Sequence, residues 1–382
     1  CFAQSPQLRA QLRSHLHTCP DMERALSRIS LHRGSPRDVL SIAAGLQSAQ
    51  AIRVLLERHE ELPLPEGLAL LRDRLGGHET LIETLTLALK PDCGMLARDG
   101  DFIRDGHHAA LDELRSLKNE GTRLIAALQQ KYAEQTGINT LKIRYNNILG
   151  YYIEITQMHQ SKVAADFIHR QTLANNLRYT TVELSELERK IGEAADKALK
   201  LELEIFAELV ATIISHQERI IHTARALSQV DVFSALAELA IRKRYVRPRI
   251  DTSLSFEIQG GRHPVVEAAL ATQGEPFIGN DCNLAESQRL WLLTGPNMAG
   301  KSTFLRQNAL IAILAQIGSF VPAASAHIGI VDKCFSRVGA ADDLARGRST
   351  FMVEMVETAT ILHQASPRSL VILDEIGQIG RA

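Results

Sequence analysis

The stretch that decides the fold is Gly295-Pro-Asn-Met-Ala-Gly-Lys-Ser302. It fits the pattern G-x-x-x-x-G-K-[ST] of phosphate-binding loops (P-loops), follows the apolar run Arg289–Thr294, and precedes a stretch of helical periodicity over 304–317. A match by chance is expected in about one chain of this length in a hundred, and the context lowers that chance further. We therefore expect a strand, a loop and a helix in succession, as in P-loop nucleotide-binding domains.

Each residue type in this loop has a physical task. Glycines let backbone N–H groups and the helix N-terminus face phosphate oxygens. Lys301 supplies a positive charge for the β and γ phosphates, and the Ser302 hydroxyl offers a hard oxygen ligand to Mg²⁺. The sequence thus predicts an ATP site that uses Mg²⁺. The predicted nucleotide-binding residues are Gly295, Pro296, Asn297, Met298, Ala299, Gly300, Lys301, Ser302 and Thr303.

A second chemical motif lies about seventy residues further on. The apolar run Ser369–Leu373 ends in Asp374 and Glu375. Parallel strands deliver their C-terminal ends to one crevice, so these acids are expected to face the P-loop. Asp374 is then a candidate for the Mg²⁺ shell, and Glu375 for the base that polarises an attacking water.

Between these motifs, Ser349 follows Arg346-Gly-Arg and precedes an apolar helical stretch. Serine is a preferred helix N-cap, so the sequence predicts that a helix begins at this position. A capped helix N-terminus can also receive a phosphate.

Composition limits the remaining possibilities. The 382 residues suffice for two or three domains, and 43 basic against 44 acidic side chains give no overall positive field for nucleic acid or an anionic membrane. The five cysteines form no C-x-x-C pair, which favours free thiols in a reducing compartment. No continuous apolar run approaches about 20 residues, so we expect a cytoplasmic protein without membrane contact. Because the chain begins at Cys1 without a Met, we expect it to be part of a longer protein.

Hydrophobic periodicity divides the chain into segments. Residues 1–125 show helical spacing, for example at Ile42, Leu46, Ala49, Ile52 and Leu56, with breaks at 34–36, 63–65 and 91–94. Residues 140–146 and 150–156 predict a β-hairpin whose second strand has two different faces. From Leu184 the helical period continues without Gly or Pro between Gly192 and Pro248, which predicts one helix of fifty-odd residues. A small β element over 125–184 is therefore inserted between helical arms.

Beyond Pro248, short apolar runs alternate with helical stretches, which favours an α/β domain with a parallel sheet covered on both faces. The basic residues Arg242, Lys243 and Arg244, with Arg247 and Arg249, permit two interpretations. They could bind phosphate groups, but basic side chains also complement the dipole at a helix C-terminus, and we favour this second role.

Taken together, these residues resemble the MutS family of DNA mismatch repair proteins. The resemblance covers essentially the whole chain and rests on motifs in the family's order and spacing. These are Gly261–Glu267, Thr294–Thr303, Gly339–Gly347, Ser349–Met355, Leu373–Gly377 and, in the inserted element, Gly150–Glu154 and Arg170–Leu173.

The resemblance implies a multidomain α and α/β fold. Residues 1–124 and 185–248 would form a helical lever core with long arms, 125–184 a DNA clamp, and 249–382 an ABC-type ATPase domain. It implies adenine contacts at Phe277 and Ile278, a water-facing role for Asn297, and a Ser349 that reaches the γ-phosphate bound by a partner subunit. It also implies a homodimer that binds mismatched double-stranded DNA, a MutL-type partner and a nucleoid-associated cytoplasmic location. The candidate contacts to the DNA backbone are Lys142, Arg144, Arg170 and Arg178.

Two departures from the family pattern shape further expectations. Gln378-Ile-Gly380 stands where the family has Arg-Gly-Thr, and the family's switch histidine has no counterpart before Ala382. A family strand that lies between the P-loop strand and the Asp374 strand is also missing, so we expect a truncated, marginal ATPase domain with weak nucleotide binding and no appreciable hydrolysis by these residues alone. The family's N-terminal mismatch-reading domain has no counterpart here, so we expect no mismatch readout by these residues themselves.

Two alternatives remain at this stage. An ABC-type coiled-coil chromosome protein shares the P-loop and arms, but its arms are longer and the G-R-H-P and S-T-F motifs argue against it. A clamp-less MutS paralogue that acts on recombination intermediates or ribosomes would lack residues 125–184, which are present.

Overall fold

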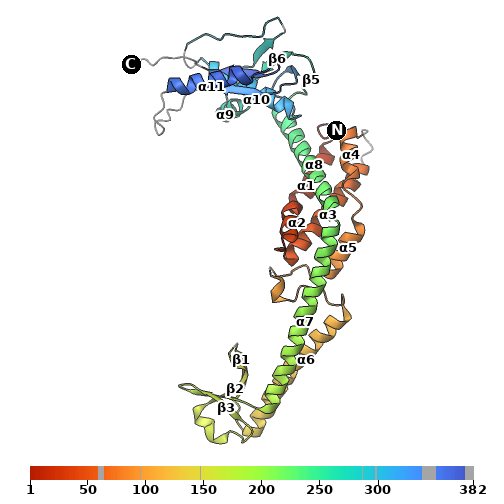
Figure 1. Cartoon of the computed structure of the whole chain (residues 1–382), viewed down its shortest axis with the longest axis vertical. Coiled ribbons are helices and arrows are strands. Elements are labelled where there is room, and N and C mark those ends of the chain that lie inside the picture. Colours follow the sequence, from red (N-terminus) through yellow and green to blue (C-terminus); the bar gives the residue numbers. More distant parts are fainter. Residues whose placement is uncertain are drawn as a thin grey trace. The chain divides into compact units, whose positions relative to one another are not determined.

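The computed structural model describes residues 1–58, 64–94, 96–146, 148–285, 287–296, 299–337 and 350–374. They form two compact units. The helical unit comprises the described residues of 15–58 and 66–228, and the sheet unit comprises 1–14, 64–65 and the described residues from 229 onward. Figure 1 shows the course of the chain through both.

The helical unit is built around α3. Its predicted stripe, Ile42, Leu46, Ala49, Ile52 and Leu56, is buried, and α3 contacts α2, α4, α5 and α7. The predicted break at 34–36 is confirmed, because Ser35 and Asp38 form a reciprocal capping box and Pro36 occupies the first turn. The helix bounds in this unit are α2 (Met22–Ser30), α3 (Pro36–Glu57), α4 (Glu66–Asp73) and α5 (Glu79–Ala88), whereas α1 (Pro6–Thr18) lies in the sheet unit up to Ser14.

Among the described residues, α3 is the one helix with the length and composition to cross a membrane, although it contains charged residues and no continuous apolar run. In the most apolar 18-residue stretch of this helix, 44% is buried within the protein. Burial against neighbouring helices is typical of a core helix in a bundle.

Two long helices, α6 (Ala109–Thr136) and α7 (Val182–Ser215), lie side by side and carry a four-stranded antiparallel sheet at one end (Figure 1). The predicted hairpin is confirmed as β1 (Lys142–Asn146) and β2 (Gly150–Thr156). The sheet has the order β1-β2-β4-β3, with β3 (Ile168–Thr172) and β4 (Asn176–Thr180). Its buried face presents Ile153, Ile155, Leu177 and Tyr179 to Tyr132, Leu184 and Ile191 of the two helices.

The prediction of one uninterrupted helix after Leu184 is wrong. The helix stops at Ser215, and α8 (Gln217–Lys243) begins after His216. The His216 N–H donates to the Ile213 carbonyl at 3.0 Å, and the His216 carbonyl accepts from the Ile220 N–H at 3.1 Å. One residue thus ends one helix and begins the next without Gly or Pro, so no sequence signal marked the interruption.

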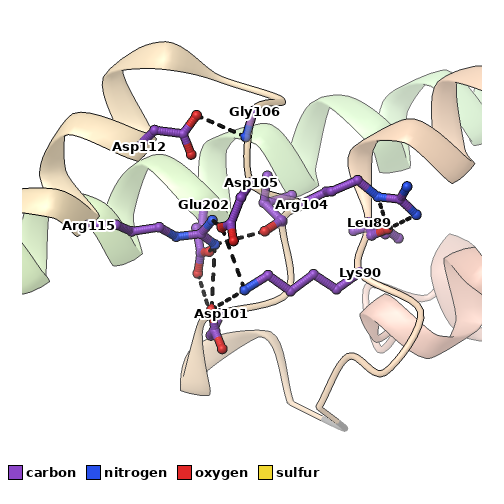
Figure 2. A network of polar contacts seen from close by, with 10 residues as sticks. Leu89, Lys90, Asp101, Arg104, Asp105, Gly106, Asp112, Arg115 and Glu202 are labelled. Atoms are coloured by element: carbon purple, nitrogen blue, oxygen red, sulfur yellow. Dashed lines mark hydrogen bonds and ion pairs between the residues drawn. The ribbon is translucent and has the colours of Figure 1, made fainter. Parts of the chain in front are cut away.

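A polar network joins the loop before α6 to the two long helices (Figure 2). Glu202 of α7 is only 3% exposed and accepts from the Arg115 guanidinium of α6 and from the Asp101 N–H at 2.6 Å. Arg115 also donates to Asp105 at 2.6 Å and to the Ile103 carbonyl at 2.9 Å. Lys90 donates to Asp101 at 2.5 Å. The network therefore fixes the loop against both helices of the pair.

The sheet unit contains a mixed four-stranded sheet of order β5-β8-β6-β7. Its strands are β5 (Arg249–Asp251), β6 (Phe256–Gly261), β7 (Asn280–Leu284) and β8 (Ser325–Gly329). In this sheet β5 and β8 pair in parallel and the other pairs are antiparallel, an arrangement that the apolar runs 289–294 and 369–373 did not predict. A separate parallel pair joins β9 (Cys334–Arg337) to β10 (Leu370–Leu373), which confirms the predicted strand before Asp374.

The strand predicted over Arg289–Thr294 is absent from the structure. These residues form no regular secondary structure, and Leu292 is 88% exposed. A strand needs a hydrogen-bonded neighbour, and among the described residues β10 pairs with β9 and has no strand on its other edge. The run is apolar, as a buried strand would be, but no described strand pairs with it.

The sheet unit also contains α9 (Pro264–Gln273), α10 (Lys301–Gln316) and α11 (Thr350–Gln364), together with α8 from Gln229 onward. The core consists of one face of α10, with Ile311, Ala312 and Ala315, packed on Phe256, Ile258 and Ile328 of the sheet. All five cysteines lie in the described residues, and none forms a disulfide.

Candidate nucleotide site and nucleic-acid interface

The P-loop sequence leads directly into α10. Gly300 is the N-cap residue, with φ 88° and ψ 6°, a left-handed conformation that glycine adopts without steric cost. Lys301 is the first helical residue, and the Phe304 N–H donates to the Gly300 carbonyl at 2.9 Å. The predicted turn into a helix is confirmed, although no strand precedes it.

The Lys301 side chain folds over the loop that precedes it. Its Nζ donates to the carbonyl oxygens of Gly295 at 2.6 Å and Pro296 at 3.0 Å. The ammonium group therefore lies against the loop backbone. A lysine there is a mobile point charge that can exchange carbonyl partners for phosphate oxygens.

Asp374 and Lys301 line one cavity of about 820 Å³. Asp374 directly follows β10, is buried, and its N–H donates to the Arg337 carbonyl at 2.8 Å. Gly295 lines the same cavity, as do apolar residues of 290–293 and of β10. The structure thus brings together the P-loop glycine, the lysine and one acid that the sequence analysis paired.

These residues suit an anionic ligand with a divalent cation. The first N–H groups of a helix have no intrahelical partners, and the first turn of α10 contains no acidic residue to repel phosphate. The half-buried Ser302 and Thr303 stand in that turn but do not line the cavity, whereas Asp374 supplies a carboxylate to it. Oxygen ligands of this kind are the ones that Mg²⁺ prefers.

Two of the described candidate residues, Phe277 and Ile278, are not brought to this cavity. Phe277 and Ile278 lie between α9 and β7, where Ile278 is 82% exposed, and neither lines the cavity. Asn297, Met298, Ser349 and Glu375 lie outside the described residues. Ala299 and Pro296 are exposed in the loop.

The face of the β1–β4 sheet opposite its core carries a row of polar residues. Lys142, Glu154, Arg178 and Gln171 lie next to one another across the four strands. The Arg178 guanidinium lies 4.5 Å from the centroid of the Tyr152 ring and donates to Gln171 at 2.9 Å. The alternation of Tyr152, Glu154 and Thr156 in the sequence predicted this shared face.

The four candidate DNA-contacting residues differ in their exposure and in their interaction partners. Arg178 is 19% exposed and is held by Tyr152, Gln171 and the Glu154 carboxylate at 3.8 Å. Arg144 is 54% exposed and pairs with Glu154 at 3.3 Å. Lys142 is exposed on β1, and Arg170 is exposed at the bulge of β3. Lys142, Arg144 and Arg170 therefore present charge to solvent, whereas Arg178 mainly supports the sheet.

Sequence reasoning quoted Arg262 within a motif but gave it no role. Its guanidinium contacts the last carbonyls of α8, Lys243 at 3.0 Å and Arg244 at 3.1 Å. The side chain of Arg242, from the basic group at that helix end, pairs with Glu238 at 2.6 Å. Arg249 lies 3.4 Å from Asp251. Arg242 and Lys243 lie in the last turn of α8, as the preferred helix-end role requires, whereas Arg249 lies on β5.

Comparison with known proteins identifies the family. A family model described as MutS family domain IV matches residues 106–197, and one described as MutS domain V matches residues 291–381. A DNA mismatch repair protein MutS of Paracoccus denitrificans is 54% identical over 98% of this chain and 43% of its own length. The chain belongs to the MutS family.

Other MutS proteins agree with this assignment. Two from Rhodopseudomonas palustris are 52% and 55% identical over 99% of this chain, which corresponds to 43% and 42% of their lengths. The chain thus spans less than half the length of the curated MutS proteins that it matches. The mixed helical and sheet structure fits MutS domains IV and V, and neither the coiled-coil chromosome protein nor the clamp-less paralogue is favoured.

Proposed function

We propose that this chain is part of a DNA mismatch repair ATPase, in which binding and hydrolysis of Mg-ATP switch a DNA clamp between states. The observation that carries the proposal is the cavity shared by Gly295, Lys301 and Asp374 at the N-terminus of α10. Membership of the MutS family supports it. In this proposal 249–382 form the ABC-type ATPase domain, 125–184 the clamp, and 1–124 with 185–248 the lever core.

At the ATP site the loop backbone and Lys301 would bind the phosphates, and Ser302 with Asp374 would hold the Mg²⁺. The metal ion would neutralise charge on the phosphates. Glu375 polarises the attacking water, and Asn297 faces that water. Phe277 and Ile278 hold the adenine, and Ser349 acts on the nucleotide of a partner subunit, which makes the active form a homodimer.

At the clamp, Lys142, Arg144 and Arg170 contact the phosphate backbone of double-stranded DNA, and Arg178 holds the sheet that carries them. Phosphate contacts position a protein on DNA without reading sequence, so the clamp would hold matched and mismatched DNA alike. A MutL-type protein and a cytoplasmic, nucleoid-associated setting without membrane contact complete the proposal.

The proposal is tested in the protein encoded by the complete open reading frame. Lys301→Ala should abolish ATP-driven release from mismatched DNA, because it removes the charge that faces the phosphates. Arg306→Ala, an exposed cation on the same helix, is the matched control and should behave as wild type. ATP-driven release that is unchanged in Lys301→Ala would refute the assignment of the P-loop.

A second variant separates binding from hydrolysis. Glu375→Ala should retain bound ATP and slow its cleavage, because only the activation of water is lost. Single-turnover cleavage at the wild-type rate would remove Glu375 from the mechanism while leaving the binding site intact.

A further inference from the structure

Three segments of the sheet unit meet at the end of β6. They are the C-terminal end of α8, the P-loop helix α10 with the residues that follow it, and the tripeptide Gly261-Arg262-His263 between β6 and α9. We infer that Arg262 is a positioning residue that couples nucleotide binding at α10 to α8. The inference rests on the proposed ATP site and names the route by which that site acts on the rest of the chain.

On one side, Arg262 holds the end of α8. One guanidinium nitrogen donates to the carbonyl oxygens of Lys243 and Arg244 at 3.0 and 3.1 Å, and Nε lies 2.9 Å from the Glu267 carboxylate of α9. The side chain is only 19% exposed. A cation at these carbonyls complements the partial negative charge of the helix C-terminus. The planar guanidinium engages the carbonyls and the carboxylate at the same time, which an ammonium group cannot do with the same geometry.

On the other side, the same residue is tied to the segment after α10. The Arg262 N–H donates to the Pro322 carbonyl at 2.7 Å. Immediately before Pro322, Val321 exchanges two backbone hydrogen bonds of 2.9 Å each with Val246, just after α8. Val321 is buried in the core formed by Ile311 of α10 and by the sheet, and Val246 packs against that core. A displacement of α10 along its axis therefore moves Val321 and Pro322, which are hydrogen-bonded to Val246 and Arg262 next to the end of α8.

Gly261 brings β6 close to the middle of α10. A Cβ at this position would lie 2.7 Å from Nε2 of Gln307 and 2.9 Å from Cγ2 of Ile258, so only glycine fits without a shift. Gln307 is fully buried on α10 and accepts from the Asn280 side chain of β7 at 3.4 Å. Gly261 thus contacts α10 while the adjacent Arg262 contacts α8, and two consecutive residues span the junction.

The chemistry of α10 gives this junction its function. Its N-terminus carries the predicted phosphate site and its C-terminal end leads into Val321 and Pro322. A continuous set of packed and hydrogen-bonded groups can carry binding energy gained at the phosphate end to α8. The structure provides that set in Val246, Val321, Pro322 and Arg262.

The test uses the protein encoded by the complete open reading frame and compares Arg262→Ala, Arg262→Lys and a matched control, Arg242→Ala. Arg242 lies at the same end of α8, is 74% exposed and pairs with Glu238 on its own helix. Three quantities are measured for each variant: ATP hydrolysis without DNA, DNA affinity without nucleotide, and the factor by which Mg-ATP accelerates release from DNA.

We expect Arg262→Ala to leave the first two quantities within about twofold of wild type and to lower the acceleration by about tenfold, a coupling change of ordinary size. Arg262→Lys should recover part of the loss, and Arg242→Ala should match wild type. If Arg262→Ala and Arg262→Lys both lose ATP hydrolysis, DNA affinity and acceleration to the same extent, the role of Arg262 is purely structural and the inference is overturned. Normal acceleration in Arg262→Ala would also overturn it. A wild-type protein that neither binds nor responds to Mg-ATP would instead refute the proposed function itself.

Discussion

The buried carboxylate of Glu202 allows a quantitative prediction on the stability of the helical unit. Glu202→Gln keeps the shape of the side chain but removes its negative charge, so the effect is electrostatic and no cavity forms. The side chain is 3% exposed, and its two partners are the Asp101 N–H and the Arg115 guanidinium. Hydrogen bonds to a charged group contribute about 1.5–3 kcal/mol each. Because Arg115 keeps Asp105 and the Ile103 carbonyl, we expect only part of that sum, about 2 kcal/mol, to be lost.

Glu204→Gln is the matched control, since it makes the same chemical change on the same helix. Glu204 is 57% exposed and lies 3.9 Å from Lys200, a surface pair of the kind that contributes at most about 0.5 kcal/mol. Urea unfolding followed by far-UV circular dichroism gives both values, and signals from the sheet unit cancel in the comparison. Equal destabilisation by the two variants would refute the structural role of the network.

Three further predictions concern other parts of the chain. Burial alone raises the pKa of Asp38, but hydrogen bonds from Arg28 and Ser35 outweigh it and lower the pKa; the wild type should therefore be more stable than Asp38→Asn at pH 7. That difference should shrink as pH falls below about 4 and through the folded pKa, in urea titrations at several pH values. Replacing Lys142 and Arg144 with alanine should weaken binding to matched and mismatched duplex equally, and lower the salt slope by about one unit per phosphate contact; a loss confined to mismatched DNA would contradict backbone binding. Residues 1–382 alone should bind Mg-ATP weakly and release no measurable phosphate, and steady turnover in a phosphate assay would contradict this.

Local patterns in the sequence were sufficient for the parts of the fold that local interactions determine. Gly34-Ser35-Pro36 predicted a break between helices because glycine and proline interrupt a helix through their own backbone geometry. The spacing of Ile42 and Leu46 predicted the buried face of α3 because one helix turn defines it. The alternation around Tyr152 and Glu154 predicted the faces of β2 for the same reason.

Features that depend on distant partners could not be predicted in this way. The run Arg289–Thr294 has the composition of a buried strand, but a strand forms only beside another strand, and sequence composition does not show which strands will be adjacent. Arg178 was named as a candidate DNA contact from its charge alone. Its stacking on Tyr152 could not be predicted, because it depends on the pairing of β2 with β4. Arg262 received no role because the carbonyls that it binds lie about twenty residues away, at the end of another element.

The central claim is that Lys301 and its loop bind the phosphates of Mg-ATP. Isothermal titration of the protein encoded by the complete open reading frame tests it most directly, with Lys301→Ala and the control Arg306→Ala measured alongside. Loss of the charged contact should cost about 2–3 kcal/mol, which weakens binding about 30- to 150-fold in Lys301→Ala, while Arg306→Ala binds as wild type does. Wild-type affinity for Mg-ATP in Lys301→Ala, or an equal loss in both variants, would contradict the account.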